Sequence, residues 1–149
     1  MFRKLEKVSR EYLYDFAVQG GAVGAITLVP VGPNTAALPE GFLVEMVTVV
    51  AEEALVAAGG TVTCGPSVDS DGYLVDMVAA LGTINNVVRS GQSAGALLWD
   101  NTNDAEITYR VGSAANTQDV VLQVGTAAIT AGKLRVRVDG VFPTSRVVG

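Results

Sequence analysis

FLVEMVTVVAEEALVAAGGTVTCG, residues 42–65, contains two runs rich in valine and threonine, separated by a turn of small residues. Val62 and Cys64 alternate with threonines, the two-residue period of a strand with one buried and one solvated face. The first run also fits helical spacing, but its β-branched cluster at 47–50 favours a strand. We therefore predict two strands joined by the small-residue turn.

The same alternation recurs in ITYRV (107–111), DVVLQV (119–124) and KLRVRVDGV (133–141). A further strand is expected at 22–31, and the tail from Phe142 is expected to end the last strand. Residues 74–88 leave open a short helix or a strand. The pattern predicts an all-β protein, an antiparallel β-sandwich or barrel.

The N-terminus carries two competing patterns. Phe2, Leu5, Ser9, Tyr12 and Phe16 follow a heptad spacing that is too short to form a stable helix alone. Alternation from Tyr12 onwards favours a strand instead. We predict an extended or short helical N-terminal arm with the first strand over residues 1–20, and a β-sandwich domain over residues 21–149.

Composition limits the function classes. The chain has 149 residues, of which 49% are hydrophobic and 17% charged, so part of the apolar excess is expected to face another subunit. One cysteine excludes an internal disulfide, and Cys64 is predicted to be a buried small hydrophobe. Glycines and prolines break the uncharged stretch 16–39, and acids interrupt a signal-peptide pattern, so we expect no membrane association and synthesis in the cytosol.

Charge is unevenly distributed. Residues 1–10 carry four basic residues and one acid, whereas residues 11–88 contain nine acids and no lysine or arginine. This pattern predicts an arm that docks on an acidic surface, such as that of a neighbouring copy, and the alternative is a disordered, solvated terminus. A pI of about 4.6 argues against nucleic acid as a partner.

GQSAG at 91–95 matches the nucleophile elbow of α/β-hydrolases, which places a serine, here Ser93, on a strained turn. That chemistry needs a base, normally histidine, and the sequence contains no histidine. The βαβ alternation of the hydrolase sheet is also absent from the pattern. We expect a small-residue loop here and no enzymatic activity.

Acidic residues suggest metal sites only weakly. Asp69, Asp71 and Asp76 surround a glycine that comes too early for a calcium loop, so we predict an Asx-type turn. Glu52 and Glu53 are adjacent on a strand and point to opposite faces, which excludes a shared acid–base role. No metal or cofactor is predicted.

Two further features concern packing. Trp99 follows small and apolar residues and is predicted to pack in the core or at an interface. Arg135 and Arg137 lie opposite the apolar residues of their strand. They are predicted to form an exposed stripe that pairs with acidic segments of the same or a neighbouring copy.

Several sequence segments follow one another in an order that resembles the small head proteins of tailed bacteriophages, in particular capsid decoration, or cement, proteins. These segments are LPEGFLVEMVTVVAEEAL, GGTVTCG, VDSDGYL and TAGKLRVRVDGVF, and the resemblance covers most of residues 38–140. The resemblance implies a jelly-roll β-sandwich that forms a homotrimer on the outer capsid and clamps neighbouring major capsid proteins, without catalytic residues. It places the protein in the virion, on the capsid surface.

The charged arm lies outside the resemblance, and we assign capsid contact to it. The expected contact residues are the basic and apolar side chains of this segment, namely Phe2, Arg3, Lys4, Leu5, Lys7, Arg10 and Tyr12. Two other readings stay open: a phage fibre or tail-tip β-module that binds a host surface, and a carbohydrate-binding β-sandwich.

Overall fold

The structure is a computed structural model that describes residues 2–32, 38–75, 77–90, 95–100, 105–106, 108–111 and 119–148. Two four-residue helices, α1 (Phe16–Gln19) and α2 (Met77–Ala80), interrupt a succession of strands. The strands are β1 (Phe2–Asp15), β2 (Gly24–Thr27), β3 (Val29–Pro30), β4 (Leu43–Val56), β5 (Thr61–Pro66), β6 (Val87–Arg89), β7 (Trp99–Asp100), β8 (Ala105–Glu106), β9 (Tyr109–Arg110), β10 (Val120–Gly125) and β11 (Ala131–Val148).

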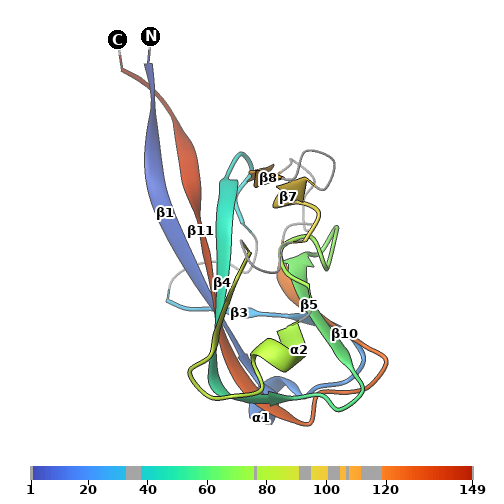
Figure 1. The fold of residues 1–149 in the computed structure, drawn as a ribbon. Helices are drawn as coiled ribbons and strands as arrows, with labels where there is room; N and C mark the ends of the chain where they lie inside the picture. The colour runs from blue at the N-terminus through green and yellow to red at the C-terminus, as the bar shows by residue number, and fades with distance from the viewer. Residues whose placement is uncertain are drawn as a thin grey trace.

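Two antiparallel sheets form the body, and the predicted all-β sandwich is confirmed (Figure 1). The larger sheet has the order β3-β1-β11-β4-β6, with β9 also paired to β4, and the smaller one has the order β2-β10-β5. β7 and β8 pair separately. The jelly-roll connectivity implied by the resemblance stays a prediction.

Residues 42–65 form the two expected strands joined by a turn, but the strands enter different sheets. β4 pairs with β11, whereas β5 pairs with β10. The intervening turn contains Gly59 at φ 74°, a left-handed conformation that glycine adopts without steric cost. The β-branched residues of the first run therefore form a strand, as predicted.

The predicted strand at 22–31 is divided at Leu28. β2 pairs with β10 of the smaller sheet, and β3 pairs with β1 of the larger one. Leu28 is buried, and its N–H donates to the carbonyl of Val120 at 3.0 Å. The chain thus crosses between the sheets at this residue.

The strands at both ends of the chain are longer than the sequence predicted. Residues 2–15 form one continuous strand, so the helical alternative for the N-terminus is wrong. β11 continues through Val148, so the prediction that the strand ends near Phe142 is also wrong. The reason is mutual pairing, because β1 and β11 run antiparallel from Asp15–Lys133 to Phe2–Val148.

Shorter elements agree with the pattern only in part. The open segment 74–88 contains the helix α2, and the strand β6 begins at its end. In the predicted strand 107–111, only Tyr109–Arg110 is a strand, and Ile107 lies outside the described residues.

The core lies between the two sheets. Inward residues of the larger sheet, such as Tyr12, Val49 and Val136, join Leu122 and Val124 of the smaller sheet in a single buried cluster. Tyr12 and Tyr14 have 0% exposure. The second half of β1 is therefore an integral part of the sandwich.

Candidate interaction surfaces

All the residues predicted to contact a capsid lie on β1. The side chains of residues 2–5 lie outside the described part of the chain, so their contacts stay a prediction. Lys7 is exposed and Arg10 is half-buried. Because successive side chains of a strand point to opposite faces, Lys7 and Arg10 do not share a face.

Of the predicted contact residues whose side chains are described, Lys7, Arg10 and Tyr12, only Tyr12 is removed from the surface. Its ring has 0% exposure and belongs to the core cluster. Burial is the main reason why the pKa of its hydroxyl is raised to about 12. Assigning a surface contact to Tyr12 was wrong, because its place in the alternation of β1 directs it inward.

The two ends of the chain form a surface element that sequence reasoning missed. We call it the terminal ribbon: Phe2–Lys7 of β1 paired with Val141–Val148 of β11. β4 pairs with β11 only as far as Val141, and β3 pairs with β1 only at Tyr12 and Leu13. Within the described part of the chain, the ribbon therefore has two strands and no third. Figure 1 shows it extending beyond the body, with the termini side by side at its tip.

Pro143 explains why the C-terminal half was not predicted. Proline usually interrupts a strand, but it is tolerated where its nitrogen side has no partner strand. β11 lacks the β4 neighbour beyond Val141, so this condition is met. The usable signal was the pair of β-branched residues Val147 and Val148 after the proline.

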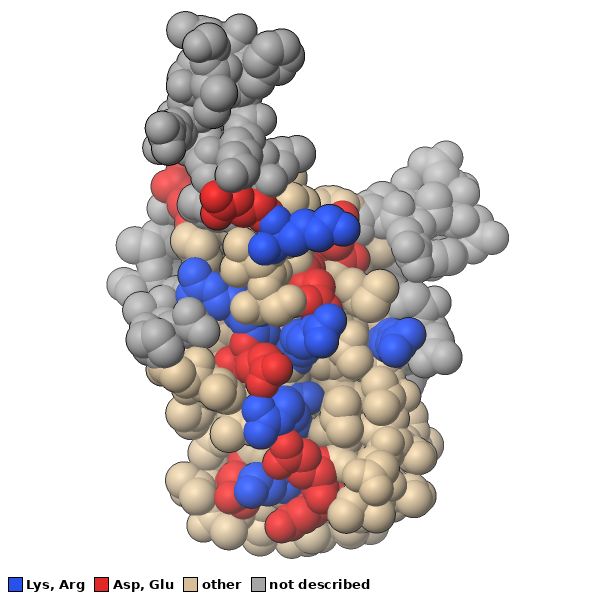
Figure 2. All heavy atoms as spheres, turned by 90° about the vertical axis from the view of Figure 1, so that its left-hand side faces the viewer, with Lys and Arg blue, Asp and Glu red and all other residues tan. Residues whose placement is uncertain are grey.

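The outward side of the larger sheet carries charges of both signs, which Figure 2 shows following one another along this face. We call this side the outer face. Its residues, placed by strand register, include Lys7, Ser9, Glu11, Leu13, Thr48, Val50, Glu52, Arg89, Arg135, Arg137 and Asp139.

Arg135 connects three strands of the outer face. Its Nη1 lies 2.7 Å from Oε2 of Glu11 on β1, and its Nε lies 2.7 Å from Oε1 of Glu52 on β4. Hydrogen bonds to Glu52 and then to Glu11 raise the pKa of the guanidinium, which stays charged. The predicted pairing of this arginine with acidic segments of the same copy is confirmed.

A second pair lies further along β11. Arg137 Nε is 2.9 Å from Oδ2 of Asp139, and the Ser9 hydroxyl donates to the same carboxylate. These outward charges therefore largely neutralise one another. A face of this kind gives little long-range attraction to a partner of either sign.

Among the described residues, three hollows are lined by residues of the two sheets and their flanking helices. One, of about 450 Å³, lies at the base of the terminal ribbon and is lined by residues that include Lys7, Ser9, Met46 and Asp139. It is open and carries both signs of charge. Two acidic residues, Glu45 and Asp139, line it, and Asp139 is already paired with Arg137.

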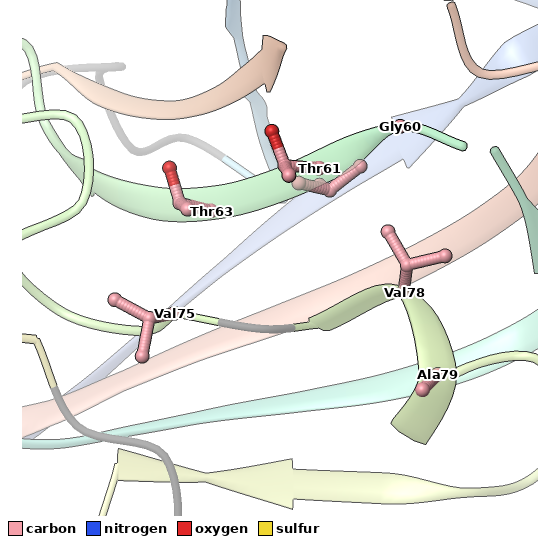
Figure 3. A pocket seen from close by; sticks show the side chains of 7 residues that line it. Gly60, Thr61, Thr63, Val75, Val78 and Ala79 are labelled. Carbon is pink, nitrogen blue, oxygen red and sulfur yellow. The ribbon is translucent and has the colours of Figure 1, made fainter. Parts of the chain in front are cut away.

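A second hollow, also of about 450 Å³, lies between β5 and the segment of α2. Val75 and Val78 extend towards β5, whereas the hydroxyls of Thr61 and Thr63 point away from them (Figure 3). The Thr63 hydroxyl donates to the Ser70 carbonyl at 3.0 Å. The apolar wall has no charged residue among its lining residues, so this hollow has no evident means of orienting a ligand.

The third hollow, which we call the β3 groove, has a volume of about 200 Å³ at the edge of the larger sheet. Its lining residues are Leu13, Asp15, Val18, Gln19, Val29 and Lys133. Val18 is 77% exposed and Val29 49% exposed, which is unusual for two neighbouring apolar side chains. The groove lies beside α1, at the end of β1 away from the chain termini (Figure 1).

The chemical motifs form no catalytic arrangement in the described part of the chain. Ser93 lies outside the described residues, whereas Gly95 is buried, and a Cβ there would approach the Asp71 carbonyl oxygen to 2.0 Å. Close packing accounts for this glycine.

Cys64 is buried, and burial raises the pKa of its thiol to about 12, which makes the predicted inert role consistent with the structure.

The aspartate cluster forms a turn. The N–H of Gly72 donates to the carbonyl of Asp69 at 2.9 Å, and a side-chain hydrogen bond with Asp71 raises the pKa of Asp69. Asp76 and the Trp99 side chain lie outside the described residues. Among the residues described, no three His, Cys, Asp or Glu side chains are grouped as a metal site would need.

The described part of the chain also has no helix that is long and apolar enough to cross a membrane. No family model matches the sequence, and no curated protein matches it.

The fold is similar to that of chains in two solved phage capsids. One is the acidic stable capsid structure of Helicobacter pylori bacteriophage KHP30, with a TM-score of 0.54 and 17% identity over 96% of this chain and 95% of that chain. The other is the cyanophage Pam1 capsid asymmetric unit, with a TM-score of 0.55 and 17% identity over 95% of this chain and 86% of that chain. The similarity therefore extends over nearly the whole of each chain.

Proposed function

We propose that this chain is a structural protein of a phage virion, a decoration or cement protein that binds the outer surface of the head and stabilises contacts between major capsid proteins. The observation that carries the proposal is the near full-length similarity of its fold to chains in two phage capsid structures. Because both chains are covered almost completely, the similarity concerns whole chains of comparable length rather than a common β-module inside a larger protein.

The terminal ribbon is the part of the chain we propose for contact with the shell. It contains Arg3, Lys4, Lys7 and Arg146 against Glu6, a net charge of 4 − 1 = +3. The whole chain has a net charge of −5, so the remaining residues carry −5 − 3 = −8. A basic element at the end of an acidic body favours docking in one orientation on an acidic partner surface.

The proposal has three further parts. The protein acts as a homotrimer, because a closed symmetric assembly buries apolar surface that a monomer would expose. It is made in the cytoplasm of the host and ends on the capsid surface. It acts through binding and has no catalytic role, in agreement with the predicted inertness of Ser93 and Cys64.

The direct test is to locate the chain in purified particles by electron microscopy. We expect additional density on the outside of the head, of a size that fits copies of this 15.4 kDa chain, contacting at least two major capsid proteins. Density confined to the tail, or absence from the particles, would reject the proposed role.

A binding experiment tests the ribbon. Because Val8 packs against the core and Glu11 pairs with Arg135, the deletion should stop at residue 6. We expect the chain without residues 2–6 to remain folded but to bind undecorated shells at least about tenfold more weakly. Arg3→Glu with Lys4→Glu should weaken binding most at low salt, where screening is smallest. Arg89→Glu is the matched control, since Arg89 is also exposed but lies outside the ribbon.

A further inference from the structure

The β3 groove combines exposed apolar side chains with a firmly held backbone. α1 begins after Asp15, whose Oδ1 accepts the N–H of Ala17 at 3.0 Å. Gln19 on the same helix donates to the Thr27 carbonyl at 2.7 Å, which ties α1 to the chain before β3. Val18 is therefore presented by a fixed element rather than by a loose turn.

The edge of the sheet at this groove is not available for adding another strand. Pro30 has no N–H, and the N–H groups of the flanking residues Leu28 and Val31 already donate to Val120 and Glu11. A partner must therefore pack side chains into the groove instead of extending the sheet. Leu13, Val18 and Val29 provide the apolar surface for that contact.

The charges at the rim fit a partner that carries the same surface. Asp15 and Lys133 are register partners on β1 and β11, so the rim presents one acid and one base side by side. Lys133 makes no ion pair with any described residue. A surface with both signs at its rim and apolar residues between them can complement another copy of itself.

Position within the molecule separates this groove from the proposed shell contact. β1 has 14 residues. At about 3.3 Å per residue, its ends are roughly 43 Å apart. The terminal ribbon lies at one end and the β3 groove at the other (Figure 1). A chain held to the shell by its ribbon thus leaves the groove free for a neighbouring copy.

We propose that the β3 groove is the surface through which copies of this chain associate with one another, with a second copy as its occupant. The inference rests on the proposed function only for the assignment of the opposite end to the shell. The contact agrees with the proposed homotrimer if the three grooves meet around a threefold axis, whereas a groove that pairs with one other groove gives a dimer.

Sedimentation velocity of the isolated chain over a range of concentrations tests this proposal. We expect the wild type to form a species larger than 15.4 kDa. Val18→Asp and Val29→Asp should each raise the dissociation constant about 100-fold or more, because a charge would replace a buried apolar side chain. Val68→Asp is the matched control, because Val68 is 52% exposed, comparable to Val29, but does not line the groove.

The thermal midpoint of each variant shows whether it is folded, and Val18 is exposed enough to be replaced without loss of the core. Equal association by Val18→Asp and Val68→Asp, or a wild type that remains monomeric, would overturn the proposal. Association through any other surface, including the capsid-facing ribbon, would appear as self-association that the groove variants leave unchanged. Binding to shells is measured separately: wild type that associates through the groove but never binds shells would reject the proposed function and leave this inference intact.

Discussion

Two tyrosine hydroxyls, those of Tyr12 and Tyr73, lie in the core without a hydrogen-bond partner among the described residues. A buried hydroxyl without a partner costs free energy on folding, whereas one with a partner contributes about 1 kcal/mol. We therefore expect Tyr12→Phe and Tyr73→Phe to leave the free energy of unfolding unchanged or to raise it by up to about 1 kcal/mol.

Tyr14→Phe is the matched control, because the Tyr14 hydroxyl donates to the Gly20 carbonyl at 2.6 Å. Its loss should lower the free energy of unfolding by about 1 kcal/mol. Urea denaturation of the three variants gives the comparison. A clear loss of stability in Tyr12→Phe would mean that its hydroxyl has a partner outside the described residues.

Burial of the Tyr12 hydroxyl predicts that the free energy of unfolding depends on pH in the alkaline range. The pKa of Tyr12 is raised from 10.0 to about 12, chiefly by burial. Below pH 10 the group is protonated in both states and its contribution to stability is constant. Between pH 10 and 12 the unfolded chain releases this proton while the folded chain retains it, so the free energy of unfolding falls as pH rises.

The slope for one such group is at most about 1.4 kcal/mol per pH unit. Denaturant unfolding at pH 9, 10.5 and 11.5 should show a smaller fall in Tyr12→Phe than in the wild type. Identical pH profiles for the two proteins would contradict the assignment of a raised pKa to Tyr12.

At the scale of elements, alternation predicted strands well where both neighbours in the sheet are present. Val47 and Val49 on β4 and Val136 on β11 point inward as their spacing requires. Tyr12 also lies on an inward position of its strand, but the charges around it suggested an exposed arm. Local charge was a poor guide because Arg10 and Tyr12 belong to a strand whose partner lies more than 120 residues away in the sequence.

The ion pairs of Arg135 give a prediction for the larger sheet, since this side chain links β11 to both β1 and β4. Arg135→Gln leaves Glu11 and Glu52 without their shared cation. Because all three side chains are about one-third exposed, we expect a loss of only about 0.5–1 kcal/mol at low salt, decreasing in 1 M salt.

Arg89→Gln is the control, because Arg89 is exposed and forms no ion pair with a described residue. It should change the free energy of unfolding by less than about 0.5 kcal/mol. A double-mutant cycle of Arg135 with Glu11 measures the coupling directly. A coupling energy of zero at low salt would show that this ion pair does not stabilise the sheet.

At the scale of the whole molecule, the candidate surfaces depend on contacts between distant segments, which limited what the sequence could predict. The basic N-terminus was visible in composition, but its pairing with Val141–Val148 was not. The β3 groove combines residues of β1, α1, β3 and β11, and no spacing within one segment indicates that they meet. The apolar excess predicted an interface without showing its position.

The terminal ribbon leads to a prediction about the chain as a whole. Its two strands pair with each other, and neither has a third strand beside it in the described part of the chain. A two-stranded ribbon is marginally stable in water, so each strand should depend on the other for order. Deleting residues 142–149 should therefore remove hydrogen-exchange protection from residues 2–6.

The body should respond differently to this deletion, because β11 still pairs with β4 up to Val141. Amides of Tyr12 and Tyr14 should keep their protection, and the thermal midpoint should change little. If shell contact needs an ordered ribbon, the same deletion should also weaken binding to shells as much as deletion of residues 2–6 does. Protection at residues 2–6 that survives the deletion would mean that the N-terminal strand is held by something other than its partner in β11, and the ribbon would not be one functional unit.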